Sequence, residues 1–170
     1  MTVTISSTLD CSPDTVWRGL QRPALLLHLS HPLLRMRLVQ PDRWPERWER
    51  GQYLVRLRLL GFIPAGEQVI RIEDPEVDPP PGHYGIRDRG WGSVAHTWDH
   101  EIRVAPLGDG KTRYTDRVVV EAGVLTPLAV AFAHMIYRHR QRRLRHLARN
   151  GFTGVLPAEP ATPLAGAHDG

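Results

Sequence analysis

Hydrophobic and polar residues alternate at the start of the chain. Over 2–9 the apolar side chains at positions 3, 5 and 9 are separated by serine and threonine, and this period of two predicts a β-strand. Two helix starts follow, each with a proline in its first turn, at Pro13 and Pro23, and Ser12 is the expected cap of the first. We therefore expect one strand followed by two short helices, over 13–20 and 23–29.

Helical spacing disappears between residues 36 and 121. Segments rich in Val, Ile, Leu, Trp and Tyr are separated there by clusters of proline and glycine, a pattern typical of an antiparallel meander. The last two strands have the clearest faces, because the even-numbered residues from His96 to Val104 and from Tyr114 to Val120 form the buried side of each. The predicted strands cover 36–40, 43–49, 53–60, 67–74, 82–89, 93–104 and 112–122.

A long helix is predicted over 126–149, with Thr126 as its cap and Pro127 at its first position. Apolar positions recur at helical spacing on one side, so this helix should pack against the sheet. These positions are Leu125, Ala129, Phe132, Ile136, Leu144 and Leu147. We expect one folded domain over 1–150 and a flexible tail, rich in proline, alanine and glycine, over 151–170.

The composition is that of an ordinary globular domain. The chain has 170 residues, of which 41% are hydrophobic and 24% charged, so neither wholesale disorder nor two full domains fits. No stretch resembles a membrane span or a secretory signal, and the cytoplasm is the expected location. Cys11 is the single cysteine and has no partner within the chain for a disulfide.

Positive charge is concentrated in one segment. Six of the 22 basic residues are arginines within 138–149, which leaves 16 basic residues against 18 acidic ones elsewhere. Cations at the C-terminal end of a helix oppose the negative end of its dipole, and this is the simplest interpretation. A transient contact with an anionic membrane surface through Arg138 to Arg149 stays open. Nucleic acid is not an expected partner, because no helix-turn-helix or aromatic stacking platform accompanies the charge.

His100 and Asp116 form the sharpest candidate pair. A hairpin turn at 107–109 would place His100 opposite Asp116 and Trp98 opposite Val118, and a register shifted by two would leave His100 diagonal to Asp116. The pair can be a structural bond, a polar anchor for a ligand or an acid/base pair. A nearby carboxylate favours the imidazolium, so we expect the pKa of His100 to lie above about 6.5.

The sequence suggests no metal site or cofactor. His96 and His100 share a strand face but would be about 13 Å apart, which is too far to bind one ion. His28 and His31 lack a nearby acid. Neither a glycine-rich phosphate loop in a strand-to-helix context nor a serine or cysteine triad can be assigned.

The order of the elements and two sequence segments resemble those of a known family. The opening ISSTLDCSPDTVW, and YTDRVVVEAG followed by LTPLAVAFAHMIYRHRQRRLRHLA, resemble the first and last elements of START-like proteins of the SRPBCC group, which includes polyketide cyclases and lipid carriers. The resemblance covers roughly residues 1–150. It implies an α+β helix-grip fold, in which a curved antiparallel sheet wraps around a long C-terminal helix.

On this basis we expect a cavity that binds a small hydrophobic or amphipathic, lipid- or polyketide-like ligand. Two alternatives stay open, namely a cyclase- or dehydratase-like enzyme that uses His100 and Asp116, and a protein-interaction module with a filled core. The expected apolar wall consists of Trp98, Ile102, Val118, Val120, Phe132, Met135 and Ile136. The expected polar contacts are His100, Tyr114, Asp116 and His139.

Overall fold

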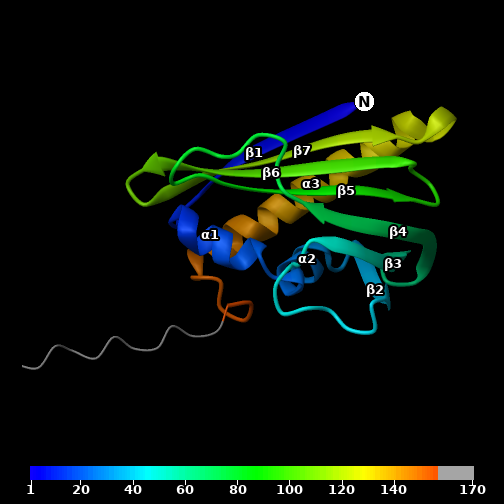
Figure 1. The fold of residues 1–170 in the computed structure, drawn as a ribbon, viewed down its shortest axis with the longest axis horizontal. Coiled ribbons are helices and arrows are strands. Elements are labelled where there is room, and N and C mark those ends of the chain that lie inside the picture. Colours follow the sequence, from blue (N-terminus) through cyan, green and yellow to red (C-terminus); the bar gives the residue numbers. More distant parts are fainter. Residues whose placement is uncertain (157–170) are drawn as a thin grey trace, which may run out of the picture.

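The computed structural model describes residues 1–156 and consists of one sheet and three α-helices (Figure 1). The elements, in chain order, are β1 (Thr2–Leu9), α1 (Pro13–Leu20), α2 (Pro23–Ser30), β2 (Leu34–Gln40), β3 (Gly51–Leu59), β4 (Ile63–Glu73), β5 (Tyr84–Gly92), β6 (Thr97–Gly108), β7 (Lys111–Glu121) and α3 (Thr126–Arg149), with a 3-10 turn, η1 (Gly123–Leu125), before α3. This is the helix-grip fold that the resemblance implied.

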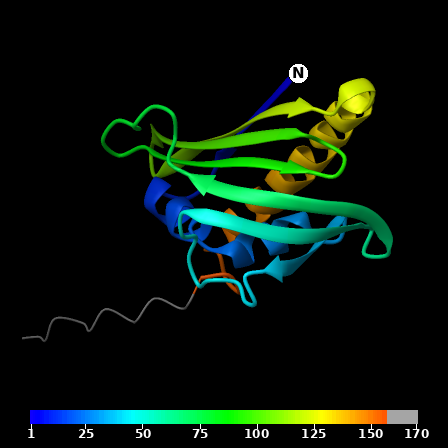
Figure 2. The ribbon, with the colours of Figure 1, turned by 45° about the vertical axis from the view of Figure 1, so that its right-hand side comes forward.

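The seven strands form one antiparallel sheet in the order β1-β7-β6-β5-β4-β3-β2. Helices α1 and α2 carry the chain from β1 at one edge to β2 at the other. Figure 2 shows the sheet curving around α3. Helix α3 packs on β1 and β7, so only this edge of the concave face is covered directly by the helix.

The expected helix starts are found at the expected prolines. The Ser12 hydroxyl accepts a hydrogen bond from the Thr15 backbone N–H (3.3 Å) and so caps α1, and Pro13 occupies its first turn. Thr126 behaves differently from the prediction. Its hydroxyl accepts from the Ala122 N–H (2.9 Å) and donates to the Gly123 carbonyl (2.7 Å), so it secures the turn before α3 and does not cap the helix.

The strand predicted over 43–49 is wrong, because this segment is a loop. Trp44 and Trp48 pack against the ring of Tyr53 on β3 and against each other, with ring centroids 5.1–6.1 Å apart. The aromatic residues that suggested a strand therefore fix the loop by packing.

The β6–β7 hairpin pairs two residues away from the first predicted register. His100 lies opposite Val118 and Ile102 opposite Asp116, because the chain turns through Asp109 and Gly110, both at positive φ, with a bulge between Pro106 and Gly108. His100 and Asp116 are thus diagonal neighbours, as the shifted register predicted. All helices within residues 1–156 are too short or too polar to cross a bilayer.

The segment after α3 contributes to the core. Residues 151–156 belong to the expected flexible tail, yet the Phe152 side chain is fully buried among Leu9, Leu25 and Leu147. A Cβ added at Gly19 would lie 2.8 Å from the Phe152 ring, so α1 approaches this ring as closely as only glycine permits. Residues 157–170 of the expected tail lie outside the described residues.

We predict that Phe152→Ala lowers the free energy of unfolding by about 3–5 kcal/mol, the range for deleting a fully buried phenylalanine side chain. Urea denaturation followed by circular dichroism measures this change. Phe62→Ala is the matched control, because Phe62 is 68% exposed and its truncation should change stability by about 0.5 kcal/mol or less. Equal stability of the two variants would show that Phe152 is not part of the core.

Candidate functional site

An apolar cavity of about 370 Å³ lies between the helices and the uncovered part of the sheet. The strands β2 to β6 contribute to its wall, and β1 and β7 contribute none of the lining residues, because α3 covers those two strands directly. The apolar lining from the sheet and helices includes Leu25, Leu29, Leu34, Met36, Val55, Leu57, Ile70, Ile72, Ile86, Trp98, Ile102, Phe132 and Ile136.

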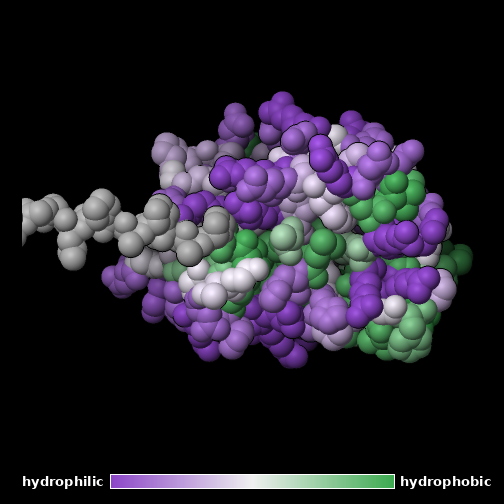
Figure 3. Space-filling view, turned by 90° about the horizontal axis from the view of Figure 1, so that it is seen from below, coloured by the Kyte–Doolittle hydropathy of each residue, from purple (hydrophilic) through white to green (hydrophobic). Residues whose placement is uncertain are grey.

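The mouth of the cavity lies between the β5–β6 turn and the start of α3. Its rim includes Val94, Leu125 and Leu128, which line the cavity and are exposed to solvent. The turn between β3 and β4 carries two further exposed apolar side chains, Leu60 and Phe62, which do not line the cavity. In Figure 3, apolar side chains gather at the end of the molecule where this turn and the start of α3 lie.

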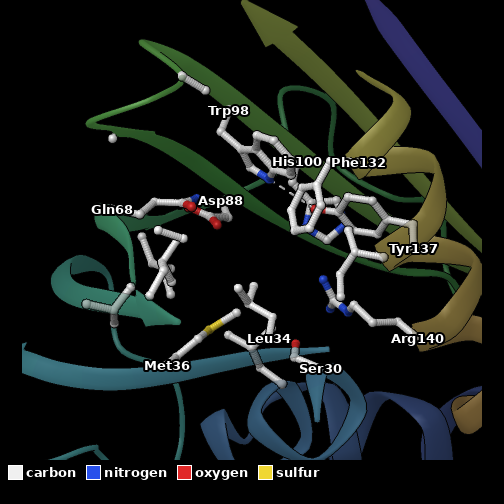
Figure 4. Close-up of a pocket in the computed structure, with 18 of the residues that line it drawn as sticks. Ser30, Leu34, Met36, Gln68, Asp88, Trp98, His100, Phe132, Tyr137 and Arg140 are labelled. Carbon is white, nitrogen blue, oxygen red and sulfur yellow. Dashed lines mark hydrogen bonds between the residues drawn. The ribbon is translucent and has the colours of Figure 1, made fainter. Parts of the chain in front are cut away.

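Polar side chains interrupt the apolar wall. Arg140 reaches into the space from α3, and the hydroxyl of Ser30 at the end of α2 points toward the same space (Figure 4). Asp88 and Gln68 lie across the cavity, on β5 and β4, and His100 lies on β6 behind the ring of Phe132. The cavity is therefore amphipathic, with polar groups on opposing sides.

His100 belongs to a buried hydrogen-bond network centred on Asp116. Oδ1 of Asp116 accepts from His100 Nε2 (2.7 Å) and from the Tyr114 hydroxyl (2.9 Å), and Oδ2 accepts from Gln141 Nε2 (2.9 Å). Gln141 Nε2 also donates to the Ile5 carbonyl on β1 (2.7 Å). The network satisfies the buried carboxylate from β6, β7 and α3.

Burial decides the protonation of this network. It lowers the pKa of His100, and the hydrogen bond and charge of Asp116 only partly oppose it, so the expected rise is wrong. Burial by itself would raise the pKa of Asp116, but the hydrogen bonds from His100 and Gln141 and the charge of Arg140 hold it below its usual value. At neutral pH a neutral imidazole thus donates from Nε2 to an ionised carboxylate.

Tyr137 joins the network to the cavity wall. Its hydroxyl accepts a hydrogen bond from Trp98 Nε1 (3.1 Å), and its ring lies 4.7 Å from that of His100. The guanidinium carbon of Arg140 lies 5.0 Å from the centre of the Tyr137 ring, within the range of a cation–π contact. Trp98, Tyr137 and Arg140 therefore form a continuous lining along one side of the cavity.

Asp88 is the acidic group on the opposite side. Its Oδ1 accepts from the Arg71 backbone N–H (2.8 Å). Burial raises the pKa of Asp88 to about 8, which the hydrogen bond from Arg71 opposes. At pH 7 this carboxyl group is mostly protonated and presents a hydrogen-bond donor or acceptor to the cavity, with little charge.

The structure divides the residues expected at the site into two groups. Five of them line the cavity, namely Trp98, His100, Ile102, Phe132 and Ile136. Four others, Tyr114, Asp116, Val118 and Val120, are buried behind the cavity, because they lie on β7 beneath α3. The placement of these four in the cavity wall is therefore corrected.

Met135 and His139 also lie outside the cavity. Met135 is on the outer side of α3 with 49% of its surface exposed. His139 Nε2 contacts the His31 carbonyl (3.0 Å), so this histidine joins α3 to the end of α2. Both residues neighbour the apolar stripe of α3 in sequence, but the helical period of 3.6 residues carries them past its edge, so their expected place in the cavity is corrected.

Sequence reasoning missed the polar lining residues Ser30, Gln68, Asp88 and Arg140, and the ring of Tyr137. In the sequence, Arg140 is one of six arginines at the basic C-terminal end of the helix, which are expected to oppose its dipole. The structure places it inside, so these arginines do not form one surface. The signal for Arg140 is its spacing of four residues from both Ile136 and Leu144, which puts all three on one helix face.

Within the described part of the chain, no three His, Cys, Asp or Glu side chains are grouped closely enough to hold a metal ion. The polar groups of the cavity are instead suited to hydrogen bonding an organic molecule, since they stand singly in an apolar wall.

Three solved structures share the fold over most of the chain. A START superfamily protein from Mycobacterium smegmatis has 15% sequence identity and a TM-score of 0.59, and the match covers 88% of this chain and 97% of that one. The Zhui aromatase/cyclase from Streptomyces sp. R1128 has 14% identity and a TM-score of 0.63, covering 91% and 96%. A conserved protein from Geobacillus kaustophilus has 18% identity and a TM-score of 0.59, covering 88% and 96%.

The fold is therefore that of the START-like, or SRPBCC, proteins. Residues 7–148 match the family described as a domain of unknown function (DUF8410), and the chain belongs to that family. None of the curated proteins matches the chain.

We predict that His100 titrates below about 6.5 in the folded protein, because burial disfavours the imidazolium. The unfolded chain then binds the extra proton first, so this group's contribution to stability is complete above about pH 6.5 and is lost as the pH falls through the folded pKa. An NMR titration of the histidine ring signals measures the value, with the chain in denaturant as reference. A folded pKa above the denatured one would contradict the burial argument.

Proposed function

We propose that the protein binds one small hydrophobic or amphipathic molecule, lipid-like or polyketide-like, in the cavity between α3 and strands β2 to β6. The observation that carries the proposal is the cavity of about 370 Å³, which falls within the range of about 300–1,000 Å³ of small-molecule sites. Its apolar wall supplies the favourable transfer of a hydrophobic guest from water.

The mouth supports the same function. Val94, Leu125 and Leu128 are apolar side chains in contact with solvent at the edge of the cavity. A hydrophobic guest that enters there exchanges water for apolar surface before it is fully enclosed. The open space between α3 and the sheet favours ligand binding over the alternative of a protein-interaction module with a filled core.

Catalysis by His100 and Asp116 has weaker support. His100 lines the cavity, but Asp116 does not, and both of its carboxylate oxygens are occupied by hydrogen bonds from the protein. The pair connects β6 to β7 and leaves only the ring of His100 for contact with a guest. We therefore propose binding, with an aromatase/cyclase among the proteins of the same fold as the reason to test for turnover as well.

We predict that Met36→Trp weakens the binding of a hydrophobic fluorescent probe such as anilinonaphthalene sulfonate by about tenfold or more, because the indole fills cavity volume and the contacts of the probe with the wall are lost. Met36 lies on β2 and its side chain extends into the cavity (Figure 4). Fluorescence titration measures the dissociation constant, and circular dichroism verifies that the variant is folded.

Met135→Trp is the matched control, because it makes the same substitution on the exposed side of α3. It should bind the probe as the wild type does. Failure of the wild type to bind the probe, or equal binding by a folded Met36→Trp variant, would refute the proposed cavity function.

A further inference from the structure

Arg140 is a buried cation for which the described residues supply no hydrogen-bond acceptor. Only 8% of the residue is exposed, and its Nε is buried and unpartnered among the described residues. A guanidinium carries five N–H donors and does not lose its charge in proteins, so it requires acceptors wherever it is removed from water. Such a group at the wall of an apolar cavity indicates that the acceptor comes from outside the protein.

The acids nearest to Arg140 do not fill this role. Asp116 acts on its charge and helps to keep the pKa of Arg140 raised against burial, but the carboxylate oxygens of Asp116 accept from His100, Tyr114 and Gln141. Asp88 lies across the cavity and accepts from the Arg71 backbone. The Tyr137 ring stabilises the charge of Arg140 by a cation–π contact. The face of the ring does not accept hydrogen bonds from the N–H groups, which lie in the plane of the guanidinium.

Ser30 presents a second unpartnered group to the same space. The residue is fully buried, and its Oγ has no hydrogen-bond partner among the described residues. It lines the cavity at the end of α2, and in Figure 4 its hydroxyl and the Arg140 guanidinium, which comes from α3, both point into the space. A hydroxyl that can donate and a guanidinium that only donates share one kind of partner, an oxygen acceptor.

We propose that Arg140 and Ser30 form a subsite for a carboxylate group, so that the ligand of the cavity is an amphipathic carboxylic acid bound as its anion. This inference rests on the proposed function and adds the chemical class of the ligand. A carboxylate has two oxygens in the geometry that a guanidinium pairs with, and the charge-assisted bonds formed in an apolar site are stronger than those between neutral groups.

The position of the subsite fixes the orientation of the ligand. Arg140 is twelve residues after Leu128 on α3, which corresponds to about 18 Å along the helix from the rim. The carboxylate therefore lies at the inner end of the cavity, and the apolar part extends along Trp98 and Phe132 toward the mouth. Asp88, mostly protonated at pH 7, lies on the other side of the space.

The test compares acids with neutral molecules of the same shape. Binding of decanoate and decanol, and of 2-naphthoate and 2-naphthalenemethanol, is measured by displacement of a fluorescent probe at pH 7. Wild-type protein should bind one or both acids about tenfold or more tightly than the matching alcohol, since the acid completes hydrogen bonds to a charged group. The two pairs distinguish alkyl from aromatic acids.

Arg140→Met should remove this preference, so that the favoured acid loses about tenfold or more in affinity while its alcohol does not, because the donor fork is gone and the apolar wall remains. Arg140→Lys should retain part of the preference, as a charge without the planar fork. Ser30→Ala should reduce it less than Arg140→Met. Arg142→Met, an exposed arginine on the same helix, is the matched control and should leave all affinities unchanged.

The outcomes distinguish a failure of the carboxylate subsite from a failure of the proposed function. If alcohols bind as tightly as acids in the wild type, or if Arg140→Met keeps the preference for acids, the carboxylate subsite is wrong and the cavity function stands. If neither acids nor alcohols displace the probe, and Met36→Trp does not affect the probe, the proposed function itself is wrong. Folding of each variant is verified by its thermal unfolding curve.

Discussion

The buried carboxylate of Asp116 is the constraint on which the arrangement of the site depends. An ionised group without solvent must be surrounded by donors, and these come from β6, β7 and α3. Because Gln141 bonds both Asp116 and the backbone of β1, the network fixes α3 in its lengthwise and rotational position on the sheet. The residue before Gln141 is Arg140, so the same bonds that seat the helix turn this guanidinium toward the cavity.

The position of α3 also explains why a cavity exists. Ala129 and Ala133 are small and buried, and they let the helix approach β1 and β7 closely. The sheet continues from β6 to β2 around the helix, past the two strands on which α3 packs directly. Helix α2 covers part of the remaining face with Leu25 and Leu29, and the space between α2, α3 and the curved sheet stays open. Curvature and close packing at one edge together produce the hollow at the other.

The sequence was sufficient for the fold because its elements are strongly patterned. The strands at 2–9 and 112–122 are marked by alternation, and the three helix starts are marked by prolines. Both signals are local, and the structure has the corresponding elements. The segment 43–49 failed because tryptophans favour strands and aromatic clusters equally, and only the tertiary contact with Tyr53 decides between them. The hairpin register depends on the positive φ of Asp109, and the sequence pattern does not specify that conformation.

The site was predicted less completely than the fold. The contact between His100 and Asp116 follows from strand alternation and a hairpin, both local features. Which of the two faces the cavity depends on where α3 lies, and that is a long-range property. Arg140 was hidden in a run of arginines whose average character is that of a solvated surface, although its spacing from Ile136 and Leu144 placed it on the buried face.

The rim of the mouth has a consequence for kinetics. Val94 lies in the turn between β5 and β6, and Leu125 and Leu128 lie in η1 and the first turn of α3, all outside the buried clusters that hold the fold together. Their movement breaks few buried contacts, and Gly123, at positive φ, lies two residues before Leu125. Under the proposed function, a ligand would leave through local opening of the rim, without unfolding of the whole domain.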